Sequence, residues 1–134
     1  MGVEVQAPAP KRRKGCYIGA PKVFVLEAAL KQVCQAFGVS ACYQVGSSLE
    51  RPDWRDVDIR LILADDAFAE LFPDAGRSWS LDPRWLLLTV AISEHLSRVT
   101  GLPIDFQFQP RTHANEAHPG PRNAMGLRLV QDEP

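Results

Sequence analysis

The sequence is poor in cysteine and shows no pattern that would put cysteines to structural use. Its three cysteines, Cys16, Cys34 and Cys42, include no closely spaced pair and leave one residue unmatched. This spacing argues against a disulfide framework and against a structural zinc site. Reduced thiols are the default for such cysteines, so we expect a cytoplasmic protein.

Long apolar runs are also missing. No stretch approaches the roughly 20 predominantly apolar residues that a membrane-spanning helix needs, and the N-terminal stretch lacks the apolar segment of a signal peptide. We therefore expect no membrane partner.

Charge of one sign is lacking as well. The formal net charge is -1 over 134 residues, so no general basic field for nucleic acid is present. The length fits one domain. A basic run at residues 11–14 lies beside an Ala-Pro segment, which predicts a disordered basic arm over residues 1–20. We expect a core over residues 21–110, followed by a loop and C-terminal docking tail over residues 111–134.

Apolar residues at helical spacing predict two main helices. Leu26, Leu30, Val33 and Phe37 recur at steps of four, three and four, and Gly38 ends the first helix. The second begins at an Asp-Pro start signal at residues 82–83. Its predicted buried stripe consists of Trp85, Leu88, Ile92, Leu96 and Val99.

Three short segments predict strands, which makes the fold class α/β (α+β): a small mixed sheet packed against helices. Residues 41–45 read as a strand that runs into Gly46 and Ser47. A second strand starts with Asp56 and Asp58 on one face, and a third, over residues 104–109, carries Asp105 on its polar face.

The paired carboxylates are the strongest chemical signal. Alternate side chains on a strand lie roughly 6.5 to 7 Å apart, so Asp56 and Asp58 would repel each other unless a cation lies between them. Mg²⁺ prefers such oxygen ligands and also binds substrate phosphates. If the strand of Asp105 pairs with that of Asp58, a third carboxylate joins the site, as in two-metal phosphoryl chemistry.

The pattern Gly46-Ser47, then Asp56-Val57-Asp58-Ile59 after a loop, then Ile104-Asp105-Phe106, resembles the minimal nucleotidyltransferases of the polymerase-β superfamily. The resemblance covers about residues 23–109. The loop after Ser47 is shorter than in typical members, and Arg55 stands where a serine often precedes the acidic pair.

The resemblance implies the nucleotidyltransferase fold and a Mg²⁺-dependent enzyme that transfers a nucleoside monophosphate from a nucleoside triphosphate such as ATP to a hydroxyl, releasing pyrophosphate. It implies that Asp56, Asp58 and Asp105 are the catalytic and metal-binding residues. Asp105 would also act as base toward the acceptor hydroxyl. The acceptor, a protein, a nucleic acid end or a small molecule, is not fixed by any motif.

Five residues are candidates for contact with the nucleotide, three of them with a structural alternative. Gly46 and Ser47 would hold the triphosphate by the same resemblance. Ser48 either adds a hydroxyl to the phosphate turn or stabilises that turn. Arg60, on the acidic face, contacts phosphate or pairs with a carboxylate. Trp54 stacks on a base or packs at the rim.

Competing functions use the same residues. The chain contains a catalytic core without a recognisable acceptor-binding domain, which is also expected of a catalytically inactive nucleotide-binding module or an antitoxin-like partner subunit. A metal-dependent phosphohydrolase, with water as acceptor, is a third reading. The helical stripe of Leu and Trp can exceed what the chain's own sheet covers, which allows a homodimer or a complex with a partner protein.

Overall fold

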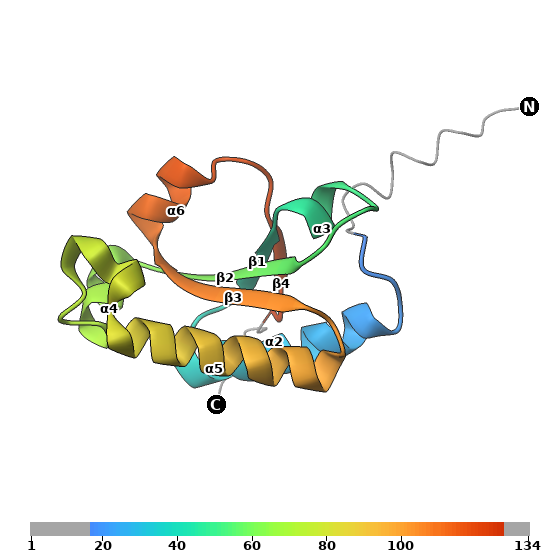
Figure 1. Cartoon of the computed structure of the whole chain (residues 1–134), viewed down its shortest axis with the longest axis horizontal. Helices are drawn as coiled ribbons and strands as arrows, with labels where there is room; N and C mark the ends of the chain where they lie inside the picture. The colour runs from blue at the N-terminus through green and yellow to red at the C-terminus, as the bar shows by residue number, and fades with distance from the viewer. Residues whose placement is uncertain (1–16, 128–134) are drawn as a thin grey trace, which may run out of the picture.

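The computed structural model describes residues 17–127 and shows a mixed four-stranded sheet (Figure 1). The strand order is β3-β2-β1-β4. β2 pairs in parallel with β3, and β1 pairs antiparallel with both β2 and β4. The strands are β1 (Cys42–Val45), β2 (Val57–Leu63), β3 (Ile104–Pro110) and β4 (Asn123–Met125). The predicted α/β class is confirmed.

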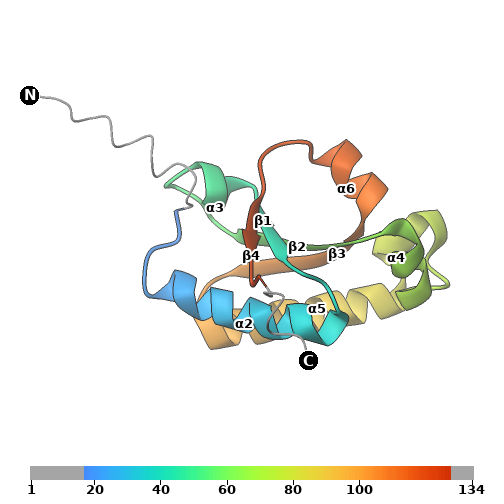
Figure 2. The same ribbon diagram turned by 180° about the vertical axis from the view of Figure 1, so that it is seen from behind.

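Two long helices cover one face of this sheet, α2 (Lys22–Phe37) and α5 (Pro83–Thr100). Both views show them together on the same side of the strands (Figures 1 and 2). Gly38 and Gly101 follow the two helices with left-handed backbone, and the Asp82 carboxylate caps α5 by accepting the Trp85 N–H at 3.0 Å. The helix start and stop signals in the sequence are therefore confirmed.

The inner face of the sheet, defined as the face against α2 and α5, is fully apolar on β2 and β3. Every second residue of β2 and β3 is buried there, as the period of a strand requires. These residues are Val57, Ile59, Leu61, Leu63, Ile104, Phe106 and Phe108. Leu26, Leu30 and Leu96 from the two helices complete the centre of the core.

Short helices connect the main elements. α3 (Ser47–Glu50) follows β1, and α4 (Asp65–Leu71) and the 3₁₀ helix η2 (Gly76–Leu81) lie between β2 and α5. Four aromatic residues from this second connection and the start of α5 meet edge to face or tilted: Phe68, Phe72, Trp79 and Trp85. This cluster closes one end of the core.

The prediction of a loop and docking tail after residue 110 is wrong for its first part. Residues 111–117 form α6 (Arg111–Ala117), and β4 adds a fourth strand to the sheet. α6 has only two turns and no side-chain cap; Asp65 holds it by accepting hydrogen bonds from the N–H and hydroxyl of Thr112. Tertiary contacts therefore stabilise this helix, and its own sequence carries little helical period. Residues 128–134 lie outside the described residues.

The predicted disordered arm falls largely outside the described residues, but its end belongs to the fold. Ile18 is buried in the core, and the Tyr17 N–H donates to the Ser48 carbonyl at 2.8 Å. The Trp54 indole donates to the Tyr17 carbonyl at 3.1 Å, so Trp54 packs at the rim of the fold. Among residues 17–127, no helix is long and apolar enough to cross a membrane.

Candidate functional site

The site lies on the outer face of the sheet, opposite α2 and α5, and its centre is a pair of aspartates. Asp58 of β2 is directly paired in register with Asp105 of β3. In parallel strands such partners point to the same side, roughly 4.8 Å apart in the pairing direction. The expectation that these two strands lie side by side with their polar faces together is confirmed.

The surroundings of the Asp58 carboxyl disfavour its charged form. Its pKa is raised, chiefly because burial disfavours the charged form; the Arg60 charge opposes this shift, and the charges of Asp105 and Asp56 add to it. A hydrogen bond with the Asp105 side chain contributes in the same direction. Two carboxyls this close favour either a shared proton or a cation between them.

Asp56 differs from the expectation that it opens the strand. β2 begins at Val57, so Asp56 lies in the loop before the strand and is exposed. The Val57 N–H donates to the Pro103 carbonyl, which starts the β2–β3 ladder one residue after Asp56. Asp56 nevertheless acts on Asp58 through its charge, so it lies at the edge of the same acidic group.

Gly46 lies directly against the Asp58 carboxyl. A Cβ added to Gly46 would be 2.5 Å from Asp58 Oδ2, so the Asp58 carboxyl would have to shift. The backbone of Gly46 has φ 78°, a conformation that strains any residue except glycine. The backbone conformation therefore favours glycine here, and the turn that begins α3 at Ser47 lies directly against Asp58.

Ser48 does not face the site. Its side chain is fully buried, and its hydroxyl accepts a hydrogen bond from Gln44 Nε2 at 2.9 Å. Gln44 Oε1 in turn accepts from Asn123 Nδ2 at 3.0 Å, which ties α3 through β1 to β4. Of the two roles that the sequence allowed, the structure favours the stabilising one. Ser47, in contrast, is partly exposed.

Arg60 is also committed to structure. Its side chain is 10% exposed, and Nη1 donates to the carbonyls of Asp105 at 2.8 Å and Ile59 at 3.0 Å. Nη2 lies 3.5 Å from Asp105 Oδ2, which is a weak ion pair. The pairing reading of Arg60 is therefore favoured over phosphate contact. Its buried Nε–H has no hydrogen-bond partner among the described residues.

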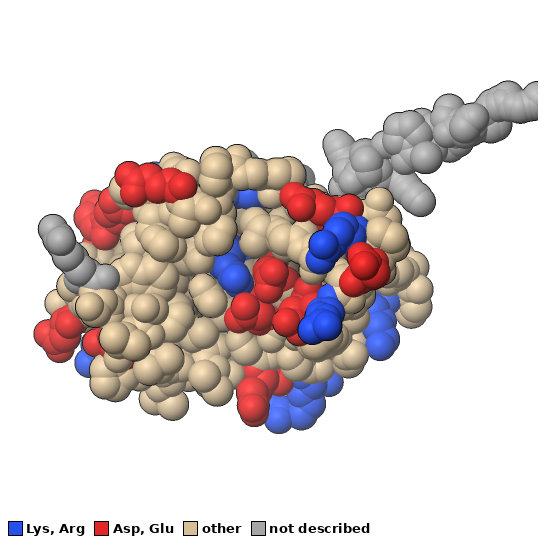
Figure 3. All heavy atoms as spheres, turned by 45° about the horizontal axis from the view of Figure 1, so that its top comes forward, with Lys and Arg blue, Asp and Glu red and all other residues tan. Residues whose placement is uncertain are grey.

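A pocket of about 360 Å³ is lined by three of these residues, Gly46, Asp58 and Arg60. Its floor and one side come from Val45, Gly46, Glu50, Asp58 and Arg60, and its opposite wall from residues 117–121, which include His118 and Gly120. Figure 3, which brings the top of Figure 1 forward, shows acidic groups gathered near the middle of this view with basic groups beside them.

The wall of the pocket was missed by sequence reasoning. The segment from α6 to residue 122 leaves the β3 edge of the sheet and reaches β4 at the other edge, so it crosses over the outer face (Figure 1). His118 lies on this crossover. Its pKa is lowered, chiefly by desolvation and then by the charges of Arg60, His113 and Arg122. Only the sheet order reveals this proximity, because nothing in the sequence fixes β4.

The ligand set for a metal is less compact than expected. Within residues 17–127, no group of three or more His, Cys, Asp or Glu side chains is arranged so that it could hold a metal ion. Asp58 and Asp105 are adjacent, but Asp56 stands apart in its loop, and Arg60 shares Asp105. The donor chemistry still fits Mg²⁺, which takes one or two carboxylates and completes its shell with water and substrate phosphates.

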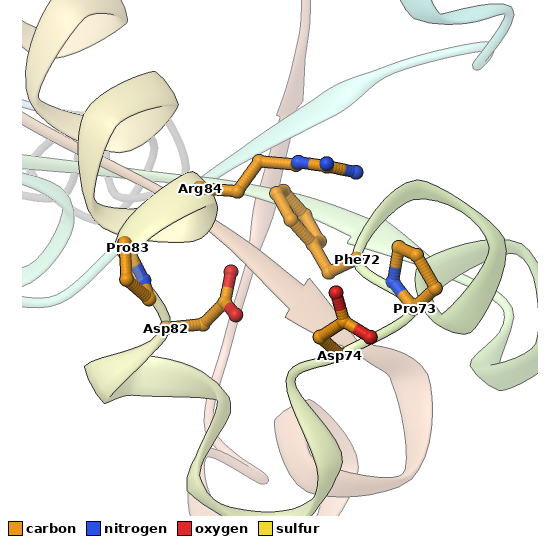
Figure 4. Close-up of a pocket in the computed structure, with 6 residues that line it drawn as sticks. All are labelled: Phe72, Pro73, Asp74, Asp82, Pro83 and Arg84. Carbon is orange, nitrogen blue, oxygen red and sulfur yellow. The ribbon is translucent and has the colours of Figure 1, made fainter.

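A second pocket, of about 200 Å³, lies away from this site at the start of α5. It is lined by Phe72, Pro73, Asp74, Asp82, Pro83 and Arg84 (Figure 4). Asp82 already caps α5, so this pocket lies where the connection that follows α4 meets the start of α5.

Comparison with known proteins gives no relative. No protein-family model, no curated protein and no solved structure matches the chain.

Proposed function

We propose that the chain is a Mg²⁺-dependent nucleotidyltransferase that transfers a nucleoside monophosphate from a nucleoside triphosphate to a hydroxyl and releases pyrophosphate. The observation that supports it best is the register pairing of Asp58 with Asp105, with Asp58 lying against Gly46 in a pocket that these two residues help to line. Three segments far apart in the sequence supply these parts, and their order matches the family pattern that the sequence resembles.

The carboxyls suit a cation that arrives with its substrate. Asp58 and Asp105, with Asp56 at the edge, would hold Mg²⁺, which supplies charge neutralisation for the triphosphate. The raised pKa of Asp58 shows that its negative charge is poorly compensated by the protein alone. Phosphates bound with the ion complete its oxygen ligands, which fits a site that is open rather than preformed.

The remaining roles follow from position. The Gly46-Ser47 turn lets backbone approach the phosphates without a side chain between them. Asp105, beside Asp58, is the base for the acceptor hydroxyl. The acceptor is a protein side chain, a nucleic acid end or a small molecule.

Transfer of label from α-labelled nucleoside triphosphates tests this function. Purified protein, Mg²⁺ and cell lysate as acceptor source should give labelled product and pyrophosphate. Asp58→Asn and Asp105→Asn should remove both, while Asp66→Asn, an exposed aspartate of α4, keeps full activity. Equal labelling by all three variants would sink the mechanism. Free nucleoside monophosphate as the main product would instead identify a phosphohydrolase.

A second candidate is a catalytically inactive nucleotide-binding module, such as an antitoxin-like partner subunit. It is favoured by the ion pair of Arg60 with Asp105 and by the lack, within the described residues, of a preformed metal-ligand group. Calorimetric binding of a Mg²⁺-nucleotide without pyrophosphate release across a panel of acceptors would support this candidate over the enzyme.

A second copy of the chain is the proposed protein partner, and α5 is the proposed contact. Leu86, Leu87 and Val90 are 42%, 70% and 53% exposed on the first half of this helix, next to exposed Ala91. Such an apolar face on a helix that already covers the core is typical of an interface.

The charges on α5 match an antiparallel pairing with a second copy. If a two-fold axis passes near residue 89, position 84 faces position 94, so Arg84 meets the partner's Glu94 while Leu87 packs on the partner's Ala91. Light scattering should show a dimer that Leu87→Glu breaks. Arg84→Glu and Glu94→Arg should each weaken the dimer, and the double swap should restore it. A wild-type monomer at all concentrations contradicts the pairing.

The cytoplasm is the proposed compartment. Cys34 and Cys42 have their sulfurs 3.7 Å apart, buried and not joined by a disulfide. Nucleoside triphosphates and reduced thiols both belong to that compartment. Protein trapped with an alkylating reagent directly from cells should carry two reduced thiols at these positions, and a Cys34–Cys42 disulfide would contradict the assignment.

A further inference from the structure

The crossover segment between α6 and β4 carries a cation, Arg122, beside a site whose central pair, Asp58 and Asp105, is acidic. A nucleoside triphosphate carries more negative charge than one bound Mg²⁺ neutralises, so a site that binds it also needs Arg or Lys contacts to phosphate oxygens. Arg60 was the sequence's candidate, but its guanidinium is bonded to Asp105 and to backbone carbonyls. Arg51 lies 3.6 Å from Asp53 in an exposed pair. Arg60 therefore lines the pocket with its guanidinium already bonded within the fold, and Arg51 is not among the residues that line the pocket.

Arg122 differs from both in its surroundings. It directly follows Pro121, which lines the pocket, and its charge acts on His118 of the same wall. Its Nη2 donates to Asn115 Oδ1 at 3.0 Å, and its guanidinium carbon lies 5.9 Å from the centre of the Tyr43 ring. Within residues 17–127 no carboxylate forms an ion pair with it.

These contacts hold the guanidinium without neutralising it. An amide oxygen and an aromatic face orient an arginine but carry no net negative charge, so the positive charge stays available to a ligand. Tyr43 is on β1 opposite Arg60, and Asn115 is on α6, so two elements of the outer face fix the position of Arg122. A partly exposed, oriented and uncompensated cation is therefore present beside a pocket that contains Asp58.

We propose that Arg122, oriented by Asn115 and Tyr43, binds the phosphate chain of the nucleotide at the pocket that Asp58 and Gly46 line. This inference rests on the proposed function, which supplies the nucleotide. It assigns the crossover a binding role: the segment carries the phosphate-binding cation across the outer face to the metal-binding carboxyls.

Calorimetry on the full chain tests the inference. The probes are Mg²⁺ complexes of non-hydrolysable analogues of the four ribonucleoside triphosphates, with the matching monophosphates for comparison. Arg122→Gln should weaken triphosphate binding roughly tenfold to a hundredfold, the scale of a hydrogen bond to a charged group, and should change monophosphate binding much less. Arg98→Gln, which removes the same charge from an exposed position of α5 on the opposite side of the sheet, should leave both affinities within about twofold.

A second variant keeps the test valid if Arg122→Gln fails to fold. Asn115→Asp leaves Arg122 in place but sets a carboxylate against its guanidinium, so triphosphate affinity should again fall while monophosphate affinity does not. Triphosphate binding by the wild type with equal affinity in Arg122→Gln and Asn115→Asp overturns the inference and leaves the proposed function intact. A wild type that binds none of the four triphosphates overturns both.

Discussion

The two faces of the sheet are made by alternate residues of the same strands but are built on opposite principles. On the inner face, Ile59 and Phe106 are fully buried among apolar helix residues. On the outer face, Asp58 and Asp105, their neighbours in sequence, stand side by side in partial exposure with like charges together. The inner face stabilises the fold, and the outer face brings groups of like charge together.

The largest difference between the faces should appear when one β3 side chain is truncated on the inner face and one on the outer face. Phe106→Ala removes a fully buried ring and should lower the free energy of unfolding by about 3–5 kcal/mol. Gln107→Ala, one residue on, removes a hydrogen bond from Gln109 at 3.2 Å and should cost about 1 kcal/mol. Urea unfolding of both variants measures this. Similar losses for the two would show that the faces do not differ as described.

A smaller effect is expected where the outer face meets the α3 turn. Gly46→Ala places a methyl group against Asp58 Oδ2 in a strained backbone conformation, so stability should fall by about 1–3 kcal/mol and nucleotide binding should be lost. Gly120→Ala is the matched control, since it lines the same pocket and its added Cβ meets nothing within 4 Å. Guanidinium unfolding and calorimetry compare the two variants. Equal behaviour would contradict the close approach.

The smallest expected effect is a gain in stability rather than a loss. The pKa of Asp58 is raised by folding, so its favourable contribution is complete below the unfolded pKa of about 3.9 and is lost as pH rises through the higher folded pKa. At pH 7 without divalent ions, Asp58→Asn should therefore stabilise the protein, by less than about 1 kcal/mol because solvent screens this half-exposed group.

The pH dependence of this variant is its own control. The gain from Asp58→Asn should vanish near pH 3, where the wild-type carboxyl is protonated in both the folded and the unfolded chain. Thermal unfolding of both proteins at the two pH values is sufficient. A variant less stable than the wild type at pH 7 would show that Asp58 supports the fold rather than straining it.

The inner face and half of the site were predictable because both depend on local periods. The spacing of Leu26 and Leu30 determines the face of α2, and alternation around Asp58 and Asp105 determines which carboxyls share a side. The adjacency of their strands followed from the resemblance and is confirmed by the register.

The other half depends on long-range contacts that no local pattern contains. Arg60 pairs with Asp105 because β2 and β3 are neighbouring strands in this register. The Ser48 side chain points inward because its hydroxyl accepts a hydrogen bond from Gln44. The wall that carries His118 exists because β4 pairs with β1, a three-residue ladder that follows a short uncapped helix. Such elements gain their stability from tertiary packing, so their sequences need little periodicity of their own.

Binding of Mn²⁺, used as a paramagnetic substitute for Mg²⁺, tests the central claim most directly. Spin resonance should detect Mn²⁺ bound to the wild-type protein when a non-hydrolysable triphosphate analogue is present, and much less in its absence, because the carboxyls hold the ion together with phosphates. Asp58→Asn and Asp105→Asn should lose this protein-bound signal, while Asp66→Asn should keep it. Nucleotide-dependent binding that is the same in all four proteins, or absent from the wild type, would contradict the account.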